Sequence, residues 1–201
     1  CIDRAVYIAI GDVTGHGLDS GIIMIMVQTI VTAYMELLLS PDQLITYLNA
    51  TLRKNLDRID SDKILTFALL RWLEGKLEVI GQHEDILILR TDGTLEIIDT
   101  FELGFPLGLE ADISPYLHYY CTELLPGEAV VIYTDGVTEA ESPTGELYGI
   151  DRLCEVALKH RHRTSQQILD EIVADIKSHI GNAKVLDDIT LIVFKQKCDS
   201  G

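Results

Sequence analysis

The chain has 201 residues, of which 47% are hydrophobic, which is enough for one globular domain with a buried core and excludes a disordered chain. Its formal net charge of −16 argues against a nucleic-acid-binding surface and against docking on anionic lipid, although a bound cation would still allow an anionic substrate. The four cysteines show no CxxC spacing, and no signal peptide is recognised, so we expect reduced thiols and a cytoplasmic protein.

The chain begins with an apolar run, residues 5–10, that predicts a buried strand. The stretch Gly11-Asp12-Val13-Thr14-Gly15-His16-Gly17 follows, and its three glycines predict a sharp turn. Asp12 is expected where the strand ends, so a rigid element would present its carboxylate in a loop. Such a residue is a candidate metal ligand, and the alternative is an aspartate that only stabilises a tight turn.

Residues 22–39 predict a long helix that is apolar on most of its surface. Its polar residues and the strand and turn before it argue against a membrane span. We therefore expect one face to lie on a sheet and the opposite face to be covered by another helix or by a second copy of the chain, as in a homodimer.

The remaining elements alternate between helical and strand periods. Ser40, Pro41 and Gln43 predict the start of a second helix that ends near Asp57. A meander of short antiparallel strands is expected over 64–98, with further strands at 116–124, 129–133 and 189–194 and helices at 151–160 and 165–180. The basic loop 161–163 is expected to be a solvated connection. Helices grouped apart from antiparallel strands indicate an α+β fold.

Three aspartates share one pattern, because each adjoins a hydrophobic strand. Asp12 and Asp135 follow strands, and Asp187 precedes one. If the last strand runs antiparallel to the other two, the three carboxylates would meet at one sheet edge. Carboxylates close together need cations to neutralise them, and oxygen ligands favour magnesium or manganese. The alternative is that each aspartate only caps a turn.

Five motifs, in this order, make the chain similar to the metal-dependent protein phosphatases (PPM family), in the bacterial branch of stage II sporulation protein E. They are GDVTGHG at 11–17, GFPLGL at 104–109, YTDGVTEA at 133–140, YGIDRL at 148–153 and DDITLIV at 187–193. GQHED at 81–85 occupies the place of the family's glycine-histidine turn, with Gln82 and Glu84 as variants.

The resemblance implies an αββα sandwich of two antiparallel sheets with helices on both outer faces, in a phosphatase domain over 1–195. The tail at 196–201 is polar, and we expect it to be frayed. The resemblance also implies hydrolysis of phosphoserine or phosphothreonine with two Mn²⁺ or Mg²⁺ ions. Their ligands would be Asp12, the carbonyl of Val13, Asp135 and Asp187, with Asp188 ranked second, and Gly136 would let the backbone pass close to the metals.

Other polar residues of these motifs are weaker candidates. His16 lies four residues after Asp12, so a structural hydrogen bond in the turn is favoured over proton transfer. Glu139 is as readily a turn residue as a site residue. The remaining histidines are expected to be surface or core residues: His83, His118, His160, His162 and His179.

The substrate would be a phosphoprotein, such as an anti-sigma-factor antagonist. The alternative is a catalytically silent module that keeps the fold and binds a partner. The family also places a Gly-Gly-Asp segment before the first strand, and its aspartate binds a metal; the sequence from Cys1 onward does not contain it. From these residues alone we expect at most one divalent ion bound tightly, weak activity and an open edge on the first sheet.

Overall fold

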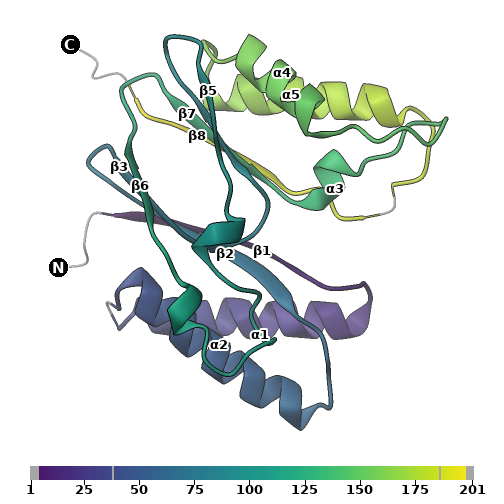
Figure 1. Cartoon of the computed structure of the whole chain (residues 1–201). Helices are drawn as coiled ribbons and strands as arrows, with labels where there is room; N and C mark the ends of the chain where they lie inside the picture. Colours follow the sequence, from purple (N-terminus) through teal and green to yellow (C-terminus); the bar gives the residue numbers. More distant parts are fainter. Residues whose placement is uncertain (1–4, 38, 186, 198–201) are drawn as a thin grey trace. The chain divides into compact units, whose positions relative to one another are not determined.

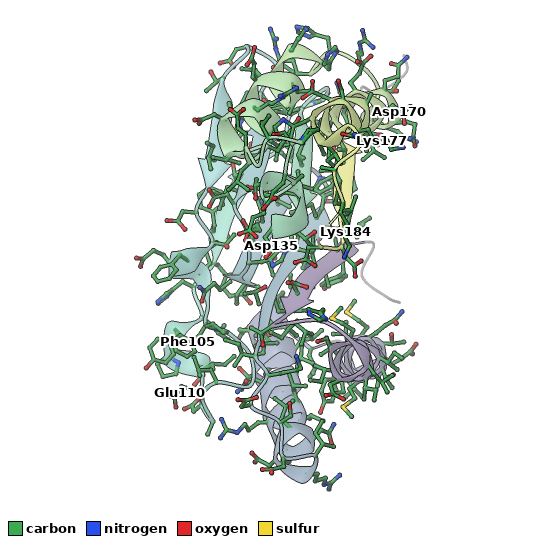
Figure 2. All side chains as sticks on the ribbon, turned by 90° about the vertical axis from the view of Figure 1, so that its right-hand side faces the viewer. Phe105, Glu110, Asp135, Asp170, Lys177 and Lys184 are labelled. Atoms are coloured by element: carbon green, nitrogen blue, oxygen red, sulfur yellow. The ribbon has the colours of Figure 1, made fainter. Side chains whose placement is uncertain are left out.

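The computed structural model describes residues 5–37, 39–185 and 187–197. The chain forms two compact units, each built from two separate segments. The first unit is Cys1–His83 with Thr100–Thr122, and the second is Glu84–Asp99 with Glu123–Gly201. Figure 1 traces the elements, and Figure 2 adds the side chains.

The first unit contains a four-stranded sheet in the order β1-β2-β3-β6. β1 pairs antiparallel with β2, and β2 with β3. Two long helices, α1 and α2, lie against one face of this sheet (Figure 1). The elements of this unit are β1 (Val6–Val13), α1 (Leu18–Met35), α2 (Pro41–Arg58), β2 (Leu65–Leu73), β3 (Lys76–Gln82), the 3₁₀ turns η1 (Phe101–Leu103) and η2 (Ser114–Tyr116), and β6 (Tyr120–Glu123).

Helix α2 begins and packs as its sequence predicts. Pro41 is its first residue, and the Gln43 side chain accepts a hydrogen bond from the Ser40 N–H at 3.2 Å. Its buried face also contains Asn49, which is 1% exposed. The Asn49 amide donates to the Glu110 carbonyl and accepts from the Gly108 N–H, each at 2.9 Å. This buried amide therefore fixes the loop 108–110 on the helix.

Helix α1 is much less covered than expected. Only Ser20, Ile23 and Val27 are buried, whereas Leu18 and Ile25 are 80% and 65% exposed. The expectation that another helix of this chain covers its outer face is wrong, because α2 packs beside α1 and leaves that face open. Among the described helices, α1 is long and apolar enough by length and composition to cross a bilayer, a test that core helices of soluble proteins also pass.

The second unit contains a four-stranded antiparallel sheet in the order β5-β4-β7-β8. Helices α4 and α5 lie against one face of this sheet (Figure 1). The elements are β4 (Ile86–Leu89), β5 (Leu95–Ile98), β7 (Ala129–Tyr133), α3 (Asp135–Thr138), α4 (Ile150–Lys159), α5 (Ser165–Ile180) and β8 (Leu191–Lys195).

Helix α5 confirms its predicted bounds and core face. Thr164 and Gln167 form a capping box at its start, and Gly181 is its C-cap with φ of 56°. Its buried residues recur every fourth position, so one apolar stripe faces the sheet: Ile168, Ile172, Ile176 and Ile180.

Several boundaries differ from the sequence prediction. The expected meander is divided, because β2 and β3 belong to the first sheet and β4 and β5 to the second. The last strand begins at Leu191 and includes Lys195, and Gln196 still exchanges hydrogen bonds of 2.9 Å with residues 127 and 128. Residues 198–201 of the expected frayed tail lie outside the described residues.

Candidate functional site

Asp12 lies inside β1 and not after it. The strand continues through the glycine, and Asp12 stands opposite Thr66 of β2 in the register. Gly11 permits this, because a Cβ there would lie 2.5 Å from the Thr66 carbonyl oxygen. Asp12 is half-buried and Val13 is 3% exposed. The strand therefore holds Asp12 rigidly, one residue before the strand ends.

The turn after β1 is fixed by side chains other than His16. Lys63 Nζ donates to the Thr14 carbonyl at 2.6 Å, and the Ser20 hydroxyl donates to the Gly15 carbonyl at 3.1 Å. Gly15 and Gly17 adopt φ of 74° and 100°, which glycine tolerates best. His16 between them is exposed. Within the described residues its ring makes no hydrogen bond, so the expected structural bond is not present.

Polar residues behind Asp12 form a connected group that the sequence did not predict. The Thr66 hydroxyl is 2.8 Å from His83 Nδ1 and 3.5 Å from the Asp12 carbonyl oxygen. The His83 N–H donates to the fully buried Thr100 hydroxyl at 2.9 Å. His83 is thus a half-buried residue of this group, and its place in GQHED is the one sequence signal for it.

Asp135 is the first residue of the short helix α3, which begins directly after β7. The N-cap residue, Thr134, connects the start of α3 to the segment that precedes β8. Its hydroxyl donates to the Asp188 carbonyl at 3.2 Å and accepts from the Thr190 N–H at 3.0 Å. Because β7 and β8 are antiparallel, with Tyr133 opposite Leu191, Asp135 and the segment 187–190 lie at the same end of this strand pair.

Gly136 makes the tight approach at this end. A Cβ there would lie 2.3 Å from the Asp188 carbonyl oxygen, a distance that real Cβ atoms essentially never show. The resemblance gives Gly136 a place close to the metals. The structure gives a further reason why a glycine is needed at this position, because its backbone packs directly on the segment that contains Asp187 and Asp188.

Asp187 and Asp188 are exposed, and the Asp187 carboxylate accepts a hydrogen bond from the Asp188 N–H at 2.8 Å. The strand geometry expected for Asp135 and Asp187 is confirmed. The expectation of a single sheet edge for all three aspartates is wrong, because Asp12 belongs to the first sheet and the other two to the second. Among described residues, no three His, Cys, Asp or Glu side chains gather closely enough to hold a metal ion.

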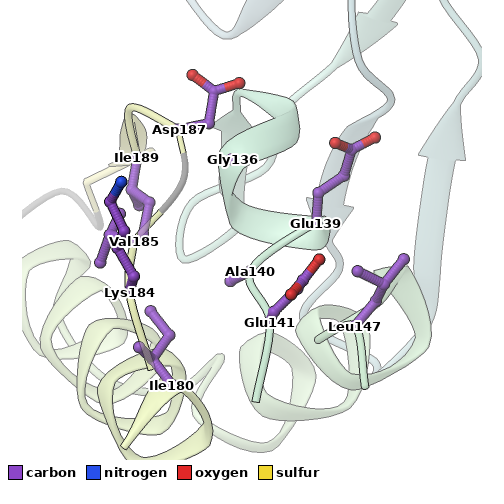
Figure 3. A pocket seen from close by; sticks show the side chains of 10 residues that line it. All are labelled: Gly136, Glu139, Ala140, Glu141, Leu147, Ile180, Lys184, Val185, Asp187 and Ile189. Atoms are coloured by element: carbon purple, nitrogen blue, oxygen red, sulfur yellow. The ribbon is translucent and has the colours of Figure 1, made fainter. Parts of the chain in front are cut away.

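A cavity of about 310 Å³ lies beside Asp187. Figure 3 shows side chains of the loop after α5 facing those of the segment after α3. Its wall combines apolar side chains with charged ones: Gly136, Glu139, Ala140, Glu141, Leu147, Ile180, Lys184, Val185, Asp187 and Ile189. Leu147 and Val185 are each 54% exposed, so the cavity presents apolar surface to solvent next to the acidic end of β7 and β8.

One wall of the cavity is fixed to α5 by a polar network. The Tyr148 hydroxyl and Arg152 Nε both donate to Asp175, at 2.9 and 2.7 Å. Arg152 Nη1 lies 3.1 Å from His179 Nδ1, and His179 Nε2 lies 2.9 Å from the Glu146 carbonyl oxygen. Since an arginine only donates, Nδ1 accepts and Nε2 carries the proton. The hairpin 141–147 is therefore held in place.

This network predicts a pH-dependent stability. The Arg152 hydrogen bond, with that of Tyr148, lowers the pKa of Asp175 from 3.8. A carboxyl whose pKa is lower in the folded state stabilises the fold above its unfolded pKa, and this contribution is lost as pH falls through the folded pKa. We expect Asp175→Asn to cost about 1 kcal/mol at neutral pH, because the pair is partly exposed, and much less at low pH.

Urea unfolding at about pH 7 and about pH 3 measures this effect. Asp170→Asn is the control, because the Asp170 carboxylate is exposed and accepts a hydrogen bond from Gln166, one turn earlier on the same helix, at 2.9 Å. An equal loss of stability for Asp175→Asn at both pH values would contradict the assignment.

Burial also changes the pKa of two acid groups in the second unit. Tyr133, which ends β7, is 1% exposed, and burial raises the pKa of its hydroxyl far above the usual range. Burial, with the nearby Asp99, raises the pKa of Asp85. Both groups therefore favour their neutral forms more than free side chains do.

Known proteins share this architecture. The SiaA-PP2C domain of Pseudomonas aeruginosa superposes with a TM-score of 0.78 at 18% identity, covering 95% of this chain and 79% of that one. The PP2C phosphatase domain of SpoIIE from Bacillus subtilis gives 0.71 at 15% identity, covering 96% and 55%. The two antiparallel sheets with flanking helices are thus the PP2C-type α+β fold, which confirms the predicted fold class.

Sequence comparisons then give the family. The model of stage II sporulation protein E (SpoIIE) matches residues 2–197, so the chain belongs to this family. Phosphoserine phosphatase RsbU of Bacillus subtilis is 25% identical over 96% of this chain and 56% of its own length. Protein IcfG of Synechocystis sp. is 33% identical over 64% of this chain and 20% of its own length. The chain therefore spans little more than half the length of RsbU and a fifth of the length of IcfG.

Proposed function

We propose that this chain is a metal-dependent phosphatase that hydrolyses phosphoserine or phosphothreonine in a regulatory protein. The observation that carries this proposal is the acidic end of the β7–β8 pair, where Thr134 joins Asp135 to the Asp187–Asp188 segment beside a cavity of about 310 Å³. The name of the relative RsbU, a phosphoserine phosphatase, supports the reaction class.

We assign the metal-binding role to Asp12, the Val13 carbonyl, Asp135 and Asp187, with Asp188 beside them. Their oxygen donors suit Mn²⁺ or Mg²⁺, and the strand pairing of β1 and of β7 with β8 holds the side chains on rigid elements. The catalytic domain of the serine/threonine phosphatase PstP, which shares this fold, was solved with two manganese ions. Bound ions of this kind lower the pKa of a water molecule and neutralise phosphoryl charge.

The protein's own residues position the reactants. Thr134 and Gly136 fix the backbone that presents Asp135 and Asp187. The cavity beside Asp187 offers Lys184 to an anionic group and apolar side chains to a residue that flanks the phosphorylated one. His16 is exposed, four residues after Asp12, and is a candidate proton donor that we rank below the aspartates.

The partner that we propose is a phosphoprotein of the anti-sigma-factor-antagonist type, in the cytoplasm. The names of two similar proteins support this proposal: RsbU of Bacillus subtilis, and the RsbU and RsbW domains of Rv1364c from Mycobacterium tuberculosis. We also propose that a second copy covers the open face of α1, where Leu18 and Ile25 are exposed. Sedimentation at several concentrations tests this, and a monomer at all of them would contradict it.

A manganese-dependent assay tests the activity. We expect hydrolysis of para-nitrophenyl phosphate and of phosphoserine and phosphothreonine peptides, loss of activity with EDTA and its return with Mn²⁺ or Mg²⁺. The second candidate function is a catalytically silent module that keeps the fold and binds a partner. A folded chain without metal-dependent turnover would support that candidate.

A further inference from the structure

A second cavity, of about 550 Å³, lies at the end of the second sheet opposite to Asp135. We call it the basic groove. Its cationic side chains are His162 and Arg163, from the loop between α4 and α5, and Lys195 and Lys197, from the end of β8. Pro126 lines it from the turn before β7.

The groove differs in charge from the rest of this chain. The whole sequence has 32 acidic residues and 16 Lys and Arg, for a net charge of −16. Three of those cations and one histidine nevertheless line this one cavity. Acidic residues also lie near it among the described residues, including Glu128, which follows the lining residue Gly127. Glu171 pairs with Arg163, and Asp92, next to the lining residue Thr91, accepts a hydrogen bond from the Thr94 N–H at 2.8 Å.

The groove is a built feature and not a loose connection. Lys195 Nζ donates to the carbonyls of Arg161 and Arg163, at 2.5 and 2.9 Å, so β8 holds the basic loop in place. Gln196 closes the same end by pairing with Gly127 and Glu128, each at 2.9 Å. The solvated connection expected from the sequence is therefore one wall of a fixed, positively charged surface.

The geometry favours a ligand with several spaced negative charges over a single phosphate. The start of α5 adjoins the groove, but its own side chains already occupy backbone donors. Thr164 Oγ1 accepts from the Gln167 N–H at 3.2 Å, and Gln167 Oε1 accepts from the Thr164 N–H at 3.1 Å. The cations stand on separate side chains, which suits carboxylates distributed along a peptide.

We propose that the basic groove docks an acidic segment of a partner protein. The groove and Asp135 adjoin opposite ends of β7. The first and last residues of this strand are four steps apart, which corresponds to a length of about 13 Å. One extended segment of a protein can therefore reach both places. Docking at the groove raises the local concentration of a phosphorylated residue near Asp135. This last consequence rests on the proposed phosphatase function, whereas the docking itself does not.

The direct test is binding, measured without turnover. A fluorescently labelled, unphosphorylated poly-glutamate peptide is titrated with the whole chain, and anisotropy reports binding. We expect affinity that falls as salt increases. The double variant Arg163→Gln/Lys197→Gln should bind about threefold to tenfold more weakly. The control Lys54→Gln/Lys76→Gln removes the same charge from exposed positions of the first unit and should bind as the unchanged chain does.

Three results would overturn the proposal. The first is equal binding of the peptide by the groove variant and by the control. The second is displacement of the peptide by inorganic phosphate when the ionic strength is held constant. The third is tighter binding of a DNA oligonucleotide than of poly-glutamate. Circular dichroism of both double variants excludes unfolding as the cause of lost binding.

Activity separates this inference from the proposed function. With a phosphoprotein substrate, the groove variant should raise KM and leave kcat unchanged, and para-nitrophenyl phosphate should be hydrolysed equally by all forms. If the groove variant hydrolyses the phosphoprotein with an unchanged KM, only the link between docking and catalysis is overturned. Absence of hydrolysis in every form would contradict the phosphatase proposal, and the binding result would still stand by itself.

Discussion

Asp135→Asn is expected to lower metal-dependent kcat/KM by at least about a hundredfold, because loss of residues that merely support metal ligands already costs 10-fold to 100-fold. The substitution keeps the side-chain shape and removes one charge. The backbone contacts of Asp135 to Thr138 and Glu139 do not involve its carboxylate, so the variant should fold. Kinetics with Mn²⁺ and isothermal titration with Mn²⁺ measure the loss of turnover and of ion binding.

The matched control is Asp170→Asn, which removes the same charge from α5, apart from Asp135 (Figure 2). The control should retain full activity. Wild-type turnover of Asp135→Asn at saturating manganese would show that Asp135 is not a ligand.

Gly136→Ala should destabilise the second unit by about 1–3 kcal/mol and abolish most activity. Its new Cβ would lie 2.3 Å from the Asp188 carbonyl oxygen, and a backbone atom cannot move aside without moving its segment. The helix α3 or the residues 187–190 must shift, and either shift separates Asp135 from Asp187. Urea unfolding and the manganese assay measure the two effects.

Gly21→Ala provides the contrast, because no atom lies within 4 Å of the Cβ it would add and α1 is helical there. It should leave the activity unchanged and stabilise the helix slightly. If Gly136→Ala were as stable and as active as this control, the packing of Gly136 on Asp188 would not be needed.

Features determined by neighbouring residues were predictable. The four-residue spacing of Ile168, Ile172, Ile176 and Ile180 gives α5 its core face, and the capping box gives its start. The same holds for the strand before Asp135. Each of these signals depends on residues close in sequence, so local periodicity and capping chemistry reveal them.

Features that depend on distant partners were not predictable. β4 pairs with β7 through contacts such as Leu87 with Val131, which the local sequence pattern does not encode. The prediction of one continuous meander over 64–98 is therefore wrong. The helix α3 has four residues, too few to show a period. The hydrogen bonds that join Thr66, His83 and Thr100 also connect residues far apart in the sequence.

The interleaving of the two units has a consequence for synthesis of the chain on the ribosome. The segment Glu84–Asp99 leaves the ribosome before the first unit is complete, yet its strands belong to the second sheet. The hairpin β4–β5 must therefore wait for β7, and the sheet is closed only when β8, near the last described residues, has emerged. Such delayed pairing exposes apolar strands to the solvent. Nascent chains stalled before β8 should accordingly be more sensitive to protease in the second unit than in the first.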